Sequence, residues 1–165
     1  MLDDISLVAL LFDANDANRL ARSWAGVLDR EIADDGLRLL PSDDIGFSIQ
    51  FQPTQEQKAG PNRMHFHLTS TSLEDEQSTV ARALGLGGRH LDVGQGPADE
   101  HVVLADPEGN EFCVIEPGNI FLAGCRFLGE LACDGSQQVG YFLERSIGLA
   151  VGLGPGPGDR ARHFQ

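Results

Sequence analysis

The stretch Glu100–Pro117, EHVVLADPEGNEFCVIEP, reads as two short strands joined by a tight turn. Residues 102–104 are strand formers, and an apolar strand resumes at Phe112. Between them the sequence DPEGN supplies a proline, which fixes φ, and a glycine and an asparagine, which accept a positive φ. The stretch therefore predicts a β-hairpin. Three of its carboxylates are expected to be solvated: Asp106, Glu108 and Glu111.

The hairpin closes a series of elements that begins at residue 63. Residues 63–69 alternate polar and apolar side chains and predict a strand. Residues 72–88 predict a helix, with Ser72 as N-cap and a glycine-rich end. Further strands are expected at 90–93, 101–105 and 111–115. The second half of the chain thus reads β-α-β-β-β.

The first half repeats this order of elements. The apolar run 5–12 has the length of a strand, and residues 16–29 have the apolar spacing of an amphipathic helix. Three short strands are expected at 31–33, 37–40 and 46–51, separated by turn sequences. A polar linker, residues 53–62, joins the halves. Because the halves share no obvious sequence identity, the repeat is one of element order.

Composition limits the classes of function. A chain of 165 residues is long enough for one domain with a core. Its net charge of −13 and pI near 4.5, without a lysine or arginine cluster, argue against nucleic acid and membrane as partners. The three cysteines do not resemble a disulfide framework, and no signal peptide or membrane-spanning run is found. A reduced, cytoplasmic protein is expected.

Two βαβββ units that include NRMHFHLT and LADPEGNEFCVIEP resemble the vicinal oxygen chelate superfamily, most closely its glyoxalase-like, bleomycin-resistance-like subgroup. The resemblance covers residues 5–117. It implies an α+β fold in which two tandem βαβββ units form one cup-shaped mixed sheet, with helices outside and a ligand pocket inside. The domains expected are a module over 1–117, with halves 1–57 and 63–117, and an extension over 118–165.

Alternation along the strands sorts the side chains between the two faces of the sheet. The apolar face of each strand is expected to pack against the helices, and the polar face to line the cup. The polar side chains predicted to bind a ligand there are His65, His67, Cys113, Ser48 and Gln50. The alternative is that one or more of these strands shows its polar face to water.

Divalent metal sites in this superfamily take ligands from three strands, and the resemblance maps those positions onto Leu7, His65 and Cys113. Leucine cannot bind a metal, and Cys113 stands where glutamate is usual. His67 shares a face with His65, so a site of His65, His67 and Cys113 is conceivable; otherwise Cys113 is a small buried hydrophobe. With one matched ligand and no further carboxylate to place, we expect no metal or other cofactor.

Residues 127–152 resemble the strand and helix that begin such a module, so the extension looks like a truncated copy followed by a flexible tail. An isolated strand and helix have apolar surface to cover. We therefore expect the extension to pack on the first module or to exchange with a second chain in a homodimer.

Two functions stay open at this point. The first is a metal-free protein that binds a small molecule in the cup, as bleomycin-resistance-like members sequester a drug. The second is a lyase, isomerase or dioxygenase of glyoxalase type, with a divalent metal near His65 or with His65 and His67 as acid and base. The missing ligands favour binding.

Overall fold

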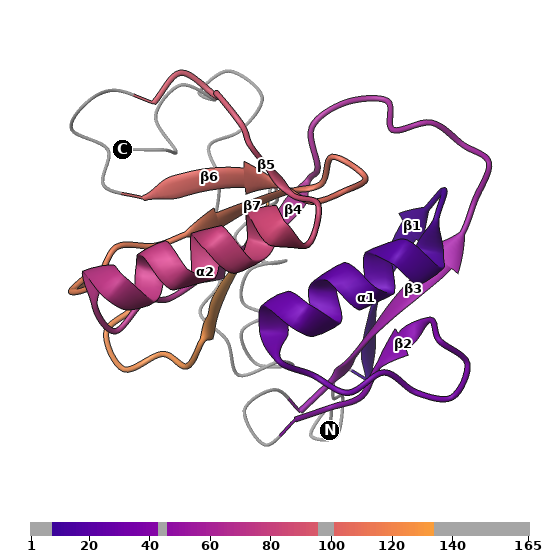
Figure 1. Ribbon diagram of the computed structural model, residues 1–165, viewed down its shortest axis with the longest axis horizontal. Helices are drawn as coiled ribbons and strands as arrows, with labels where there is room; N and C mark the ends of the chain where they lie inside the picture. Colours follow the sequence, from indigo (N-terminus) through magenta and orange to yellow (C-terminus); the bar gives the residue numbers. More distant parts are fainter. Residues whose placement is uncertain (1–7, 43–45, 96–100, 134–165) are drawn as a thin grey trace, which may run out of the picture.

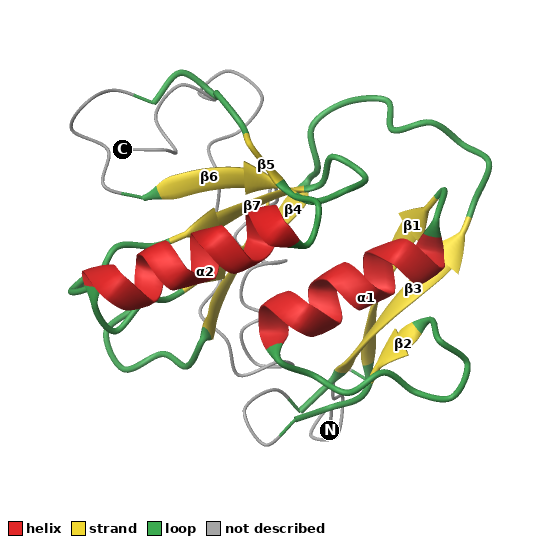
Figure 2. Ribbon diagram, viewed as in Figure 1, coloured by secondary structure: helices red, strands yellow, loops and turns green. Residues whose placement is uncertain are grey.

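The computed structural model describes residues 8–42, 46–95 and 101–133 of the chain. Strands and helices mix in an α+β arrangement of two open sheets (Figure 1, Figure 2). Helices α1 (Ala17–Leu28) and α2 (Leu73–Gly85) lie side by side and cover the same side of the sheets (Figure 1). This arrangement confirms the predicted fold class.

The first half forms a three-stranded sheet in the order β1-β3-β2. β1 pairs in parallel with β3, and β2 pairs antiparallel with β3. Asp16 caps the helix, because its carboxylate accepts a hydrogen bond of 3.0 Å from the Arg19 N–H. The elements are β1 (Ala9–Ala14), α1 (Ala17–Leu28), β2 (Arg38–Leu39) and β3 (Ser48–Pro53). The strand predicted over 31–33 is wrong: it is reduced to one bridge, between Ile32 and Leu39.

The second half forms a five-stranded sheet in the order β5-β6-β7-β4-β8. Its hairpin is present as predicted, with β6 and β7 antiparallel and Gly109 at a φ of 87°. Ser72 caps α2 by accepting from the Asp75 N–H. The elements are β4 (Met64–Leu68), α2 (Leu73–Gly85), β5 (Arg89–His90), β6 (Val102–Ala105), β7 (Glu111–Val114) and β8 (Leu128–Cys133).

Strand β8 comes from the extension and lies antiparallel to β4, with Leu131 opposite Phe66. Leu131 and Cys133 are buried in the main core. The strand expected at the start of the extension is thus present and packs on the first module. The helix expected after it falls in residues 134–165, outside the described residues, and the division into domains stays a prediction.

Aromatic rings join the two halves in the core. The Trp24 indole of α1 meets Phe66 of β4 edge-on at 5.4 Å between ring centroids and Phe112 of β7 at 5.0 Å. Phe12 of β1 lies 5.6 Å from Phe66 and 5.7 Å from Phe51 of β3. Tilted and edge-on pairs at these distances are favourable. The two sheets therefore share one core beneath the helices.

The Asp106 carboxylate lies in this core rather than in water, so its predicted solvation is wrong. Asp106 is 2% exposed and accepts four hydrogen bonds of 2.9 Å. The donors are the Trp24 Nε1–H, the Glu108 and Asn110 backbone N–H groups and the Asn110 side-chain amide. Burial raises the pKa of Asp106, and the four hydrogen bonds oppose that rise.

The two other hairpin carboxylates also have protein partners. Glu108 accepts from the Asn15 and Asp16 backbone N–H groups at 3.0 and 2.8 Å, just before α1 begins. Glu111 forms an ion pair with Lys58 at 3.2 Å. The hairpin is therefore tied to the start of α1 and to the linker. Neither helix among the described residues is long and apolar enough to cross a bilayer.

We predict that Leu131→Ala lowers the free energy of unfolding by about 2–5 kcal/mol, because it opens a cavity in a core that β8 completes. Chemical denaturation measures this loss. The matched control, Leu73→Ala, removes a leucine that is 61% exposed and changes stability by less than about 0.5 kcal/mol. Equal effects of the two substitutions would contradict the role of β8 in the core.

We predict that Asp106→Asn lowers the free energy of unfolding by about 1–3 kcal/mol, because the new amide nitrogen cannot accept a hydrogen bond from the Trp24 Nε1–H or the Asn110 amide. Urea unfolding monitored by tryptophan fluorescence measures the loss. Asp92→Asn is the control: this exposed aspartate accepts from the Gly94 N–H in a turn, and its loss costs less than about 1 kcal/mol. A cost for Asp106→Asn no larger than that of the control refutes the prediction.

Candidate functional site

A row of side chains crosses the five-stranded sheet on the face opposite the helices. Strand pairing sets Val103 beside Cys113, Cys113 beside His67, and His67 beside Glu130. His65 lies two residues before His67 on β4 and therefore projects from the same face. Phe66 and Leu68, on the other face, belong to the core. The predicted alternation thus brings His65, His67 and Cys113 together.

The two histidines contact each other directly. Their Nε2 atoms are 3.0 Å apart, and the ring centroids are 4.8 Å apart. The other ring nitrogen of His67, Nδ1, lies 2.5 Å from Oε2 of Glu130. One ligand atom each from His65, His67 and Cys113 lies within 4.8 Å of the others. This is a compact group of nitrogen and sulfur atoms with a carboxylate beside it.

Cys113 is buried in a small apolar cluster with Val103, Ile115 and Leu122. Burial raises the pKa of its thiol to about 12, and the nearby Glu130 carboxylate adds to the rise. A neutral thiol is a poor nucleophile. The environment of Cys113 therefore does not favour a role as an activated nucleophile.

Ser48 and Gln50 lie apart from this group, in the three-stranded sheet. Ser48 is buried, and its hydroxyl donates to the Val8 carbonyl oxygen at 3.1 Å. The Gln50 side-chain amide lies 3.5 Å from the Phe51 carbonyl oxygen. The five predicted ligand-binding residues thus fall into two groups on two sheets.

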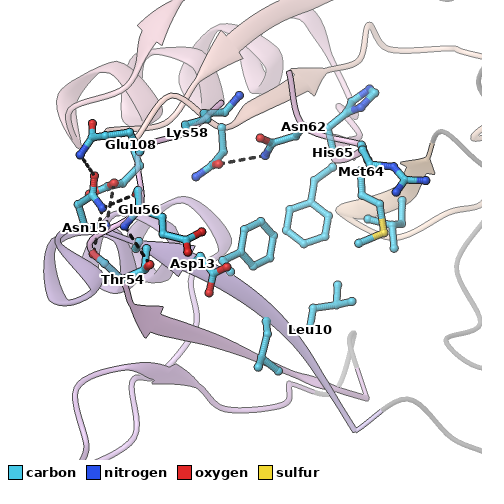
Figure 3. A pocket seen from close by; sticks show the side chains of 18 residues that line it. Leu10, Asp13, Asn15, Thr54, Glu56, Lys58, Asn62, Met64, His65 and Glu108 are labelled. Atoms are coloured by element: carbon cyan, nitrogen blue, oxygen red, sulfur yellow. Dashed lines mark hydrogen bonds between the residues drawn. The ribbon is translucent and has the colours of Figure 1, made fainter. Parts of the chain in front are cut away.

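A cavity of about 440 Å³ lies between the two sheets, where β1 faces β4 (Figure 3). Among the five predicted residues, His65 is the one that lines it. The rest of the lining comes from β1, from the linker after β3, from β4, from the hairpin turn and from β8. The lining residues are Leu10–Asn15, Thr54, Glu56–Lys58, Asn62–Phe66, Glu108, Asn110 and Leu131.

The cavity has an apolar part and an acidic part. Leu10 and Met64 lie toward one end and Asp13 and Glu56 toward the other (Figure 3). Within the described ranges, the Asp13 and Glu56 carboxylates form no hydrogen bond or ion pair with the protein. Lys58 is neutralised by Glu111. The acidic end can therefore accept a cation.

Sequence reasoning missed two features of these sites. The linker was expected only to join the halves, although five of its residues line the cavity: Thr54, Glu56, Gln57, Lys58 and Asn62. Glu130 was missed because its place beside His67 depends on how β8 pairs with β4. The charged and amide side chains of the linker were a signal in the sequence for its place in the cavity. The sequence holds no comparable signal for the contact between Glu130 and His67.

Comparisons with known proteins agree on the fold. The family model described as "Glyoxalase-like domain" matches residues 9–115. A glyoxalase/bleomycin resistance protein/dioxygenase family enzyme from Burkholderia phytofirmans PsJN is similar in structure, with a TM-score of 0.53 and 14% identity over 66% of this chain and 96% of its own. A glyoxalase-related enzyme from Fulvimarina pelagi has a TM-score of 0.51 and 14% identity, and the match covers 66% of this chain and 86% of that one.

A glyoxalase I mutant from Zea mays has a TM-score of 0.52 and 12% identity, and the match covers 84% of this chain and 54% of that one. At these identities the likeness shows the fold alone. A search of curated proteins finds no match.

We predict that iodoacetamide at pH 8 modifies Cys113 roughly a thousandfold more slowly in the native protein than in the unfolded protein, because the thiol is buried and its pKa is about 12. Mass spectrometry of the alkylated peptides measures the rate. Cys125, which is half-buried, serves as the internal control and reacts faster. Equal native rates at the two cysteines would contradict this description of the thiol.

Proposed function

The chain belongs to the family of glyoxalase-like domains, as its sequence resemblance predicted, and from this premise we propose that it binds a small molecule in the cavity between β1 and β4. The ligand that fits has an apolar body and a cationic group. The observation that supports the proposal is the lining of the cavity, which joins apolar side chains to two carboxylates that have no partner among the described residues.

The size of the cavity suits such a ligand. Its volume of about 440 Å³ lies within the range of roughly 300–1,000 Å³ that is usual for small-molecule sites. Leu10, Phe12, Met64, Phe66 and Leu131 supply apolar surface, and burying a ligand against it is favourable at about 25 cal/mol per Å². An apolar body is therefore the main source of affinity.

The charges of the lining set the preference for a cation. The carboxylate of Glu108 is already engaged by two backbone N–H groups, which leaves Asp13 and Glu56 for a ligand. Lys58, one of the two lysine and arginine residues in the lining, is paired with Glu111, so Arg63 is one positive charge against these two negative charges. The net charge of −13 adds a long-range attraction for cations. Binding of this kind needs no metal.

Enzymatic activity of glyoxalase type is the second candidate, and the position of His65 favours it. His65 lines the cavity and its Nε2 lies 3.0 Å from that of His67. A histidine pair at a cavity wall can pass a proton to or from a bound molecule. Turnover of a bound ligand that is lost in His65→Gln, with binding retained, is the result that selects this candidate.

We extend the proposal to a homodimer in the cytoplasm. β1 lies at the edge of its sheet among the described strands, and the neighbouring Val8 and Leu11 are 76% and 62% exposed. Exposed apolar side chains beside a sheet edge are suited to pairing with a second copy. Sedimentation analysis tests the dimer, and a monomer at all concentrations refutes it.

We predict that the protein binds 1-naphthylmethylamine, a cation at neutral pH, more tightly than 1-naphthoic acid, its anionic counterpart. Titration calorimetry and thermal shift measure the two affinities. Asp13→Asn weakens binding of the amine by about twofold to fivefold, as expected for a charge pair with one exposed carboxylate, and leaves the affinity for the acid unchanged or higher. Met64→Ala weakens the binding of both probes, because it removes apolar surface from the cavity.

The controls are exposed residues of the same type outside the cavity. Asp92→Asn is matched to the Asp13 variant, and Ile120→Ala, at a residue that is 80% exposed, is matched to the Met64 variant. Neither control changes either affinity. Absence of binding for both probes, or a preference for the acid, would overturn the proposed ligand class.

A further inference from the structure

We propose that His65, His67 and Cys113 bind a zinc ion, with Glu130 orienting His67 for that role. The ligand atoms of the three residues already lie within 4.8 Å of one another. Apart from His65, none of these residues lines the cavity between the sheets. The inference therefore does not depend on the proposed function.

The geometry requires small adjustments to receive the ion. Tetrahedral zinc holds nitrogen at about 2.0–2.1 Å and sulfur at about 2.3 Å, which sets ligand atoms roughly 3.3–3.7 Å apart. The two Nε2 atoms are 3.0 Å apart and the widest spacing in the group is no more than 4.8 Å. Rotation about side-chain torsions covers such differences. The backbone needs no rearrangement, because strand pairing already sets the three residues side by side.

Glu130 supplies the contact that a metal-binding histidine commonly has. In many zinc sites the ring nitrogen that does not bind the ion donates to a carboxylate, which fixes the tautomer and the ring orientation. His67 Nδ1 lies 2.5 Å from Glu130 Oε2. A neutral His67 that donates from Nδ1 carries its lone pair on Nε2, the atom that faces His65. Glu130 is thus a positioning residue.

The donor set selects the kind of ion. Two imidazoles and a thiolate are borderline to soft ligands, which suit zinc and disfavour magnesium and calcium, whose preferred ligands are oxygens. Three protein ligands leave a fourth position for water or a small molecule. Binding replaces the proton of the Cys113 thiol, so protons are released as zinc enters.

This set of residues shares His65 and Cys113 with the three positions that the family resemblance implies and differs from them in its third ligand, His67. The first-strand position is Leu7, which has no donor atom, and Cys113 stands in place of glutamate. The added carboxylate comes from β8, whose residues 128–133 follow the part of the chain that matches the family model, residues 9–115. The three ligands thus lie within the family domain, on β4 and β7, and the chain's extension supplies the carboxylate that orients His67.

Cobalt and zinc titrations of untagged, chelator-treated protein test the inference. Cobalt bound by a thiolate gives a charge-transfer band in the near ultraviolet. We expect this band to saturate at one equivalent per chain and to vanish when zinc is added. Cys113→Ala abolishes the band, His67→Ala lowers zinc affinity by more than a hundredfold, and Glu130→Gln lowers it by about tenfold to a hundredfold.

Matched controls separate the site from other thiols and imidazoles. Cys125→Ala and His90→Ala remove the same groups at a half-buried and an exposed position that do not belong to the three proposed ligands, and both leave zinc affinity unchanged. Circular dichroism shows whether Cys113→Ala folds. If it does not fold, the decision rests on His67→Ala and Glu130→Gln.

Three results would overturn the inference: no thiolate–cobalt band in the unmodified protein, a band that survives the loss of Cys113, or zinc affinity that is insensitive to His67→Ala. An unchanged affinity in Glu130→Gln refutes the positioning role. The naphthyl probes report separately on the cavity, which Cys113, His67 and Glu130 do not line, so failure of one proposal does not imply failure of the other.

Discussion

The Asp106 carboxylate accepts four hydrogen bonds in the core, and the join between the hairpin and helix α1 depends on it. A buried carboxylate is costly unless its lone pairs are satisfied. Here the donors come from its own turn and from Trp24 in the first half. Trp24 in turn touches Phe66 and Phe112, so the same carboxylate that shapes the turn also fixes the ring at the centre of the core.

Opposite faces of one sheet serve two purposes in this protein. The helix-side face of β4 contributes Phe66 and Leu68 to the core, and the other face carries His65 and His67. β8 follows the same division, with Leu131 in the core and Glu130 beside His67. The packing that holds the strands together therefore also sets the spacing of the polar group.

Features governed by local pattern could be predicted from the sequence, and features governed by distant contacts could not. The hairpin, the two helices and the shared face of His65 and His67 follow from turn chemistry and alternation. The burial of Asp106 was missed because its reason is an indole 82 positions away in the chain. The linker's place in the cavity and the pairing of β8 with β4 are likewise tertiary contacts. The prediction of a strand over 31–33 was wrong, because this segment forms a single bridge, between Ile32 and Leu39, and no ladder.

The contact between His67 and Glu130 couples a side chain to the docking of a whole strand. Glu130 reaches His67 when β8 is paired with β4, and not otherwise. By thermodynamic linkage, any ligand that binds His67 better with Glu130 in place favours the docked strand by the same free energy. Conversely, any change that destabilises the pairing of β8 with β4 weakens the binding of that ligand. Ligand binding at the histidine pair and the docking of β8 on β4 are therefore thermodynamically coupled.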